Sequence, residues 1–401
     1  MCKMEYSVIF VFTFVVSYVR PECLLSLKED FGSPAPVLLH NSSLLAPTTD
    51  GHVALRRADT ITAACPGRGK FVVLGDQLTE YTTISLQCVS ATNFKDPASG
   101  WSGTLEQVRC SAPPWYQAVP TGRLCHSRNK MYRVGYNVSN TFYPLYELCF
   151  DHGRLTTLFS KYQLSPGSYY GQIAKRPAFI EGGLFGKVSM SRLYKVEHQR
   201  SRLRDILGEG MEHRYITQQE FLNRGHLAAK ADFPMSAEQR GTFHYANAAP
   251  QWMRGNAGDW AALEEAVRRR VRARNATRAV AVYTGTFGVC TLADNRGVQR
   301  PVYLATDENN NEVVPVPLYL YKIVHDPSDS SATVFISINS PYYNESTLEQ
   351  LSFCQDVCSG DSRFSWLRWR NDGTHSFCCE YRDFAKTINV IPKIKVNGLF
   401  Y

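Results

Sequence analysis

Twelve cysteines constrain the fold of this 401-residue chain more than any other feature of its sequence. Two lie near the start, five lie between Cys65 and Cys149, Cys290 stands alone, and four lie between Cys354 and Cys379. In an exported protein such a set predicts disulfides, whereas in a reducing compartment it would suggest metal ligands or catalysis. The cellular compartment therefore decides how the cysteines are interpreted.

The first residues are typical of a secretory signal peptide. Lys3 precedes an apolar run over residues 8–19, which is shorter than the ~20 residues that span a bilayer. No later apolar run is long enough either, so we expect a secreted, extracellular protein that loses residues 1–23 and has no membrane partner. The first cysteine leaves with this signal. Cleavage just after Cys23 would leave ten cysteines, enough for five disulfides.

Two interpretations of the last cysteine group stay open at this point. Cys354, Cys358, His375 and Cys378 offer the ligand types of a zinc site, but the oxidising compartment favours disulfides. Asn-x-Ser/Thr sequons fit the same compartment and predict a glycoprotein. They start at Asn41, Asn137, Asn275 and Asn344.

Composition divides the rest of the chain into three parts. Residues 24–60 are rich in Ser, Pro, Thr and Leu without a regular hydrophobic period, so we expect a poorly ordered lead-in. Residues 61–130 carry short apolar runs between Gly and Pro clusters, which predicts a small, disulfide-stapled, β-rich domain. Residues 131–395 form a second domain of different composition.

The hydrophobic pattern of this second domain predicts several strands and one helix. The helix should run from Trp260 to about Arg274, because Leu263, Val267 and Val271 recur every four positions among charged residues. Turn signals separate the apolar segments that predict strands. These segments are 145–150, 155–159, 279–286, 301–305, 316–324 and 333–338.

Residues with catalytic chemistry concentrate between positions 223 and 268. His226 lies in the segment Asn223-Arg224-Gly225-His226, and its ordinary pKa near neutrality suits a general base acting on water. The guanidinium of Arg224 has a fixed fork of donors that matches a phosphate. Asn256, thirty residues after His226, offers the hard carbonyl oxygen that Mg²⁺ accepts.

Each of these residues alone also has an ordinary structural explanation. An isolated histidine is more often a structural or surface residue than a base. Glu264 and Arg268 are spaced i, i+4 on the predicted helix, which alone indicates a solvated salt bridge. The combination at this spacing is what favours a catalytic site.

The combination resembles the ββα-metal, DNA/RNA non-specific endonuclease family. The amino-acid sequence of these motifs is most similar to the secreted arthropod branch, the insect double-stranded ribonucleases and crustacean duplex-preferring nucleases. One position departs from the family pattern, because Asn223 stands where the family carries an aspartate. The resemblance covers roughly residues 130–395. It is carried by Asn223-Arg224-Gly225-His226, Asn247, Pro250-Gln251, Asn256, Trp260, Glu264 and Arg268.

The resemblance implies an α+β fold, a ββα-metal nuclease domain with a central antiparallel sheet flanked by helices. It implies that His226 is the base, that Asn256 binds Mg²⁺, with Mn²⁺ as a substitute, and that Glu264 orients metal-bound water. Arg224 would bind a phosphate oxygen. We expect further substrate contacts from Arg268, Asn247, Gln251, Arg154 and Lys230.

Net charge agrees with a nucleic-acid partner. Forty-four Lys and Arg exceed 36 Asp and Glu, which gives +8 and favours polyanions. A run of arginines between Arg268 and Arg278 could track the phosphates of a duplex, although a solvated helix face explains about half of it. The sequence indicates no protein partner.

The expected function is that of a secreted, Mg²⁺-dependent endonuclease. It would hydrolyse double-stranded RNA and/or DNA to oligonucleotides with 5′ phosphates. An alternative is a catalytically silent relative that binds nucleic acid or another polyanion, such as heparan sulfate. A structural, disulfide-rich secreted protein is a third candidate, but it leaves residues 223–268 unexplained. A silent relative would be expected to lack His226 or Asn256, and both are present.

Overall fold

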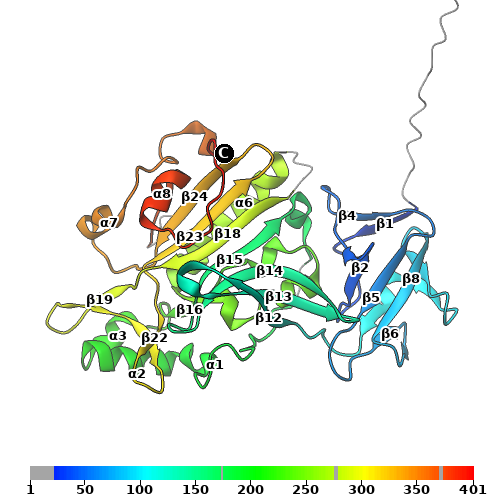
Figure 1. Ribbon diagram of the computed structural model, residues 1–401, viewed down its shortest axis with the longest axis horizontal. Coiled ribbons are helices and arrows are strands. Elements are labelled where there is room, and N and C mark those ends of the chain that lie inside the picture. The colour runs from blue at the N-terminus through cyan, green and yellow to red at the C-terminus, as the bar shows by residue number, and fades with distance from the viewer. Residues whose placement is uncertain (1–21, 173–174, 275–278, 370–373) are drawn as a thin grey trace, which may run out of the picture.

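The computed structural model describes residues 22–172, 175–274, 279–369 and 374–401 (Figure 1). An N-terminal part, residues 22–116, lies beside a larger C-terminal part, residues 117–401. The apolar run at residues 8–19 lies outside the described residues, as do Asn275 and Arg278. The predicted signal peptide therefore stays a prediction.

Short antiparallel strands build the N-terminal part. A six-stranded sheet has the order β10-β9-β8-β5-β2-β3, a three-stranded sheet has the order β11-β6-β7, and β1 pairs with β4. The strands are β1 Cys23–Ser26, β2 Val37–His40, β3 Ser43–Leu44, β4 His52–Leu55, β5 Thr60–Ala64, β6 Val72–Leu74, β7 Gln77–Leu78, β8 Thr83–Ser90, β9 Asn93–Lys95, β10 Ser102–Thr104 and β11 Val108–Cys110.

The prediction of a poorly ordered lead-in at residues 24–60 is wrong. Strands occupy much of this segment, and their partners lie far along the chain, as in the pairing of Val37 with Ala64. Such strands are two to five residues long, too short to show an alternating hydrophobic pattern. Their side chains belong to the core of the N-terminal part, which contains Leu25, Leu38 and Val53.

Two disulfides stabilise this core. Cys23 is bonded to Cys88, and Cys65 is bonded to Cys110. Cys23 is therefore a structural residue, which contradicts the placing of the signal cleavage just after it. A third disulfide joins Cys125 to the strand residue Cys149 in the C-terminal part.

An eight-stranded antiparallel sheet organises the C-terminal part, with the order β12-β13-β14-β15-β18-β23-β24-β25. Its first strand starts at Gln117, so this part begins earlier than the predicted boundary at residue 131. Most of the predicted strands are confirmed within it. The strands are β12 Gln117–Leu124, β13 Lys130–Val138, β14 Thr141–Asp151, β15 Thr156–Leu164, β18 Val280–Phe287, β23 Tyr319–Asp326, β24 Ser331–Ile338 and β25 His375–Cys379.

Both faces of the central strands are buried. Along β18, Val282 joins one hydrophobic cluster, whereas its neighbours Ala281 and Tyr283 join the cluster on the opposite face. This alternation follows from the two-residue repeat of a strand. The first cluster also contains Leu263 and Val267 from the predicted helix, so this helix covers one face of the sheet.

Helices and small hairpins surround the sheet, and the predicted helix is confirmed as α6. Among the described residues, no helix combines the length and apolar character that crossing a membrane requires. The helices are α1 Met190–Leu193, α2 Val196–Leu207, α3 Met211–Tyr215, α4 Ser236–Gly241, α5 Met253–Gly255, α6 Ala261–Ala273, α7 Glu345–Leu351 and α8 Tyr381–Thr387. The paired strands are β16 Leu222–His226 with β17 Ala248–Trp252, β19 Thr291–Ala293 with β20 Gln299–Pro301, and β21 Tyr303–Thr306 with β22 Glu312–Pro315.

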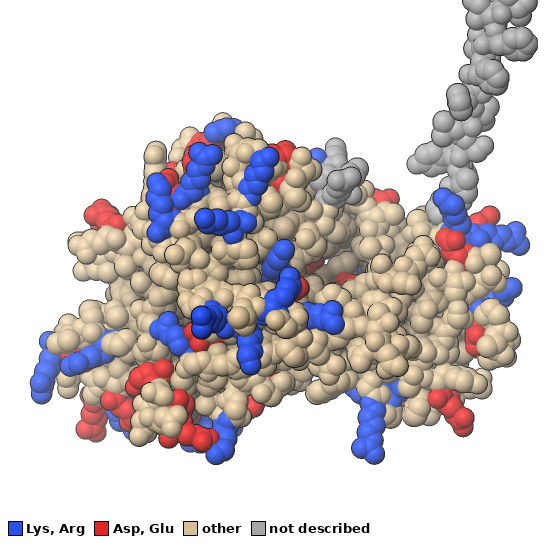
Figure 2. All heavy atoms as spheres, viewed as in Figure 1, with Lys and Arg blue, Asp and Glu red and all other residues tan. Residues whose placement is uncertain are grey.

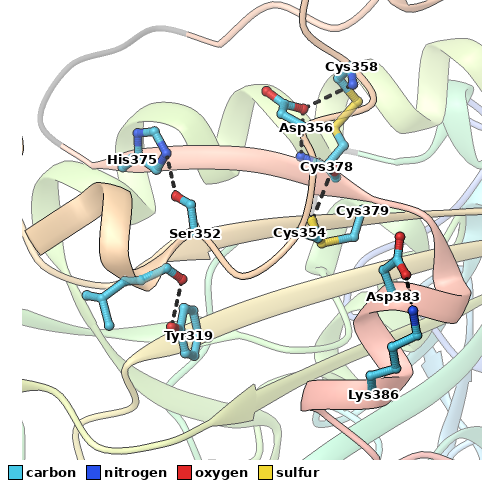
Figure 3. Close-up of a disulfide and its surroundings, with 11 residues drawn as sticks. Tyr319, Ser352, Cys354, Asp356, Cys358, His375, Cys378, Cys379, Asp383 and Lys386 are labelled. Carbon is cyan, nitrogen blue, oxygen red and sulfur yellow. Dashed lines mark hydrogen bonds and ion pairs between the residues drawn. A yellow bond between two sulfur atoms is a disulfide. The ribbon is translucent and has the colours of Figure 1, made fainter.

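The last cysteine group forms two disulfides, Cys354–Cys379 and Cys358–Cys378 (Figure 3). The carboxylate of Asp356 accepts hydrogen bonds from the backbone N–H groups of Cys358 and Cys378, each at 3.0 Å. Sulfurs bonded to each other are not thiolate ligands, so the zinc interpretation is wrong and the disulfide interpretation is confirmed. The fold contains five disulfides, with Cys23 included and the buried Cys290 left as a free thiol.

Candidate active site

The candidate site is built on one ββα unit. Strand β16 carries the Asn223–His226 segment and pairs antiparallel with β17, so that His226 lies opposite Ala248. The chain then enters α5 and α6, which are joined by a π-helical turn, Asn256–Trp260. Such turns inside helices occur frequently at functional sites. Asn256, the predicted metal ligand, is the first residue of this turn.

Gly225 allows the two strands to approach each other. A Cβ atom at this position would lie 2.3 Å from Oε1 of Gln251, which is closer than real Cβ contacts allow. Any other residue would therefore force the Gln251 side chain to move, because the Gln251 Cβ would also lie only 2.9 Å away. Because His226 is the next residue, the glycine sets the position of the histidine through this close approach.

His226 packs between two aromatic rings. Its ring centroid lies 5.1 Å from that of Phe179 and 4.8 Å from that of Phe243. The residue as a whole is half-buried, and its Nε2 atom is fully buried and makes no hydrogen bond to a described residue. Burial, with smaller effects from Arg176 and Lys230, lowers the pKa of His226 to about 3. The imidazole is therefore neutral at physiological pH, as a base requires.

Arg224 is surrounded by aromatic rings and not by carboxylates. Its guanidinium carbon lies 5.2 Å from the ring centroid of Tyr194 and 5.8 Å from those of Phe179 and Tyr245. Its Nε donates a hydrogen bond of 3.2 Å to the Tyr245 hydroxyl. In the described parts of the chain no carboxylate forms an ion pair with Arg224, so its charge stays available to an anion.

Two more cations face His226. Lys230, predicted as a substrate contact, has a pKa lowered by burial and by the nearby charge of Arg176. Arg176 itself is exposed, and its guanidinium carbon lies 5.7 Å from the Phe243 ring centroid. Arg176 was not predicted from the sequence, because it precedes the motif by some fifty residues and lies in no recognisable pattern. The surroundings of His226 suit a bound phosphate.

The helical half of the site follows Asn256 at intervals of four residues. Trp260, Glu264 and Arg268 succeed it at this spacing, and along α6 the spacing places Glu264 and Arg268 on one face of the helix. Asn256 is separated from α6 by the non-helical backbone of Gly258 (φ −91°, ψ −113°), so it lies outside this regular repeat. Asn223, the departure from the family pattern, lies with its Nδ2 2.7 Å from the sulfur of Met253. This contact connects β16 to the helical segment that carries Asn256.

Glu264 is half-buried beside a group of charges. Burial raises its pKa to about 7, and the neighbouring carboxylate of Asp232 acts in the same direction. Lys322 and Arg268 act in the opposite direction and favour the carboxylate form. Glu264 is therefore close to the balance between its two protonation states at neutral pH.

Lys322 and Asp232 are held in place by hydrogen bonds. Nζ of Lys322, which is only 1% exposed, donates to the hydroxyls of Thr284 at 2.9 Å and Tyr162 at 3.2 Å. The Tyr162 hydroxyl donates to Asp232 at 2.6 Å, and Arg268 donates to the same carboxylate at 2.8 Å. We call Asp232, Glu264, Arg268 and Lys322 the buried charge cluster.

Two of the predicted substrate contacts, Asn247 and Gln251, are buried, and a third, Arg268, is half-buried. Arg268 is committed to Asp232, and its side chain is 14% exposed. Asn247 is fully buried, and its amide bonds the backbone of Ala228 in both directions, at 2.8 and 2.9 Å, which fixes the chain just after His226. Gln251 is 1% exposed and packs against Gly225. Asn247 and Gln251 are therefore structural residues of the site, and the substrate contact of Arg268 stays a prediction.

Arg154 and two arginines of the run have partners within the protein, and the substrate contact of Arg154 stays a prediction. Arg154 is exposed in the turn between β14 and β15, where it donates to the Tyr303 hydroxyl at 3.3 Å. In the run, Arg270 donates to the carbonyl of Tyr401, and Arg274 pairs with Asp329 at 2.7 Å. Arg270 and Arg274 therefore have internal partners, which is neither a solvated helix face nor a free phosphate contact.

Comparison with known proteins identifies the family. A model of the DNA/RNA non-specific endonucleases matches residues 127–383, which is more than half of the chain. The chain therefore belongs to the DNA/RNA non-specific endonuclease family. This membership and the α+β architecture confirm the family and fold that the sequence motifs predict.

Insect salivary proteins are among its relatives. The chain is 29% identical to a salivary endonuclease of Lutzomyia longipalpis, over 94% of this chain and 86% of the relative. It is 24% identical to salivary protein Tsal2A of Glossina morsitans morsitans, over 94% of both. A salivary endonuclease of Culex quinquefasciatus is 24% identical over 71% of this chain and 72% of the relative. A solved EndoG/EndoGI complex contains a similar chain, with a TM-score of 0.36, 17% identity, and coverage of 63% of this chain and 87% of that one.

Proposed function

We propose that this chain is a secreted, Mg²⁺-dependent endonuclease that cleaves RNA and DNA, prefers duplexes and leaves 5′ phosphates. The neutral imidazole of His226, placed among the cations Arg224, Arg176 and Lys230, is the observation that carries the proposal. Five disulfides and the salivary names of its relatives support secretion. The duplex preference rests on the resemblance to the arthropod branch.

The residues of the site divide the reaction between them. His226 takes a proton from the water that attacks the phosphorus in line with the departing 3′ oxygen. Arg224 binds a non-bridging oxygen of the same phosphate, with Arg176 and Lys230 adding positive charge. The rings of Phe179 and Phe243 hold the imidazole in place on two sides. Since the nucleophile is water, the ribose 2′-hydroxyl is not needed, and both RNA and DNA can react.

The donor set fits a divalent cation. Asn256 offers an amide oxygen and Glu264 a carboxylate, the hard ligands that Mg²⁺ and Mn²⁺ prefer. Burial raises the pKa of Glu264, so a cation beside it supplies the charge that would keep it ionised. We propose that Asn256 binds the ion directly and that Glu264 orients its water ligands. When bound, the ion supplies charge neutralisation at the phosphate.

Digestion of matched substrates by the purified full chain tests this proposal. Double- and single-stranded RNA and DNA of one sequence are incubated with Mg²⁺, with Mn²⁺, and with a chelator. We expect cleavage of all four with either metal, fastest on duplexes, and none with the chelator. Products should be ligatable without a kinase, because ligation needs a 5′ phosphate. Binding without cleavage under every metal condition would instead identify the silent polyanion-binding relative.

A further inference from the structure

A groove of about 490 Å³ separates the N-terminal part from the C-terminal part on the side of Arg176. Its N-terminal wall contains Phe31 and Pro113, and its other wall contains Pro177 and Ser236. We infer that this groove binds the phosphate backbone of a nucleic-acid strand as it leaves the catalytic histidine. The inference rests on the proposed function and adds to it a role for the N-terminal part.

Charge is the first argument for this groove. Four cations line it, and no carboxylate is among its lining residues. Lys28 comes from the N-terminal part, whereas Lys175, Arg176 and Arg240 come from the C-terminal part. Lys70 lies close enough to Arg240 for that charge to lower the pKa of Lys70. Cations converge here from both parts of the molecule, as a polyanion requires.

A second hollow between the same two parts is lined by residues of a different charge. It measures about 440 Å³, and its lining includes the carboxylates of Glu147, Asp232 and Glu238 but only one lysine, Lys161. On the face that Figure 2 displays, acidic and basic side chains are interspersed over both parts. The net charge of +8 is therefore not spread evenly, and the carboxylate-free groove is a distinct feature.

Continuity with the catalytic histidine is the second argument. Arg176 lines the groove and also lies over the ring of Phe243, 5.7 Å from its centroid. The same ring lies 4.8 Å from the ring of His226, and the charge of Arg176 acts on that imidazole. A strand with one phosphate at His226 thus has its next phosphates at the mouth of the groove. Contacts to phosphates carry no sequence information, which fits a non-specific nuclease.

An exposed tryptophan stands beside the N-terminal wall. Trp115 directly follows the groove residues Pro113 and Pro114, and its side chain is 49% exposed. Nζ of Lys70 lies 5.9 Å from its ring centroid and donates a hydrogen bond to the carbonyl of Pro113. An exposed ring next to cations is the usual platform on which bases of a strand stack.

Charge reversal of two exposed groove lysines tests the inference. In the full chain carrying Lys28→Glu and Lys175→Glu, the affinity for a labelled 30-base-pair duplex should fall ~10-fold or more at 0.15 M salt. The slope of log affinity against log salt should become shallower by about 1.8 on DNA, because two phosphate contacts are lost. In cleavage assays the loss should appear in KM and not in kcat. Lys28→Ala with Lys175→Ala should give the same pattern in weaker form.

A matched control carries the same charge change elsewhere. Lys95→Glu with Lys393→Glu also alters one exposed lysine in each part, away from the groove, and should bind within a factor of two of the native chain. Equal affinities of the two double variants would overturn the inference. So would a groove variant that loses heparin binding but keeps its duplex affinity, because the groove would then serve a polysaccharide. Since binding is measured directly, it remains informative if the native chain proves unable to cleave, which would refute only the proposed function.

Discussion

The candidate site has a histidine half around His226 and a glutamate half around Glu264, and burial has a different consequence for each. Burial is the largest cause of both pKa shifts, lowering that of His226 to about 3 and raising that of Glu264 to about 7. In each case burial favours the uncharged form. A neutral imidazole is already a competent base, but a neutral carboxyl is a poor partner for a cation. The histidine half is therefore ready for the reaction, whereas the glutamate half depends on neighbouring positive charge.

Removing the base tests the first half most directly. His226→Ala should reduce cleavage by roughly 10²–10⁴-fold or more, because no described neighbour offers an equivalent base. Duplex affinity and the thermal unfolding temperature should stay near those of the native chain. His126→Ala, at an exposed histidine in the turn before β13, is the matched control and should keep full activity. Near-native turnover by His226→Ala would refute the assignment of the base.

Substitution of Asn256 tests whether a bound metal ion supplies the positive charge that the glutamate half needs. Asn256→Ala should lower activity by about 10²-fold and raise the Mg²⁺ concentration needed for half-maximal rate, since outer partners alone hold a metal weakly. Titration of activity with Mg²⁺ measures both effects. The control is Asn309→Ala, at an exposed asparagine of the loop between β21 and β22. An unchanged Mg²⁺ dependence would mean that Asn256 is not the ligand.

The buried charge cluster provides the next test. Lys322 favours the ionised form of Glu264, so Lys322→Met should raise the pKa of Glu264 further. Activity that requires the carboxylate should then fall at pH 7 and recover at higher pH, which moves the acidic limb of the rate profile upward. The change also removes the hydrogen bonds of Lys322 to Thr284 and Tyr162, which should lower the free energy of unfolding.

The exposed pair of Lys386 and Asp383 supplies the control for this change. Lys386→Met breaks an ion pair of 2.7 Å at the surface, where such pairs contribute about 0–1 kcal/mol. Urea unfolding and the pH–rate profile should therefore match those of the native chain. If Lys322→Met behaves in the same way, the buried charge cluster does not tune Glu264.

Glu238 has a raised pKa like Glu264 but no proposed catalytic role, so it tests whether a raised pKa alone matters for activity. Burial raises its pKa to about 7 as well, but no cation among the described residues pairs with it. Its folded-state pKa exceeds the unfolded value, so its contribution to stability is present below about pH 4.5 and is lost as pH rises through about 7. Glu238→Gln should therefore raise the free energy of unfolding by up to about 3 kcal/mol at pH 8 and much less at pH 4.5. Its kcat should not change, and a large loss of kcat would place Glu238 in the site.

The strands of the central sheet and the residues of the ββα unit were predictable from sequence because their signals are local. His226, Asn256 and Glu264 lie within forty residues of one another, at spacings that a strand pair and a helix bring together. Their proposed roles follow from side-chain chemistry. The sequence did not reveal which polar residues of the motif are structural, because burial of Asn247 and Gln251 depends on the packing of other segments.

The features that the sequence did not predict depend on contacts between distant segments of the chain. Lys322 lies on β23, and the only local sign of it is a lysine within the apolar strand Tyr319–Asp326. Arg176 acts on His226 from a loop that carries no pattern. The short strands of residues 24–60 pair with strands that follow later in the chain. Contacts of this kind arise from tertiary structure, which periodicity cannot report.

The order of the disulfides along the chain determines where proteolysis could separate the two parts. Cys23–Cys88 and Cys65–Cys110 overlap in sequence, so one cut anywhere between residues 23 and 110 leaves the fragments covalently joined. The next disulfide starts at Cys125. A single cut can therefore detach the N-terminal part only between residues 110 and 125, where the exposed Arg123 offers a site for trypsin-like enzymes. In a protease-rich fluid, that short connection decides whether the groove keeps both of its walls.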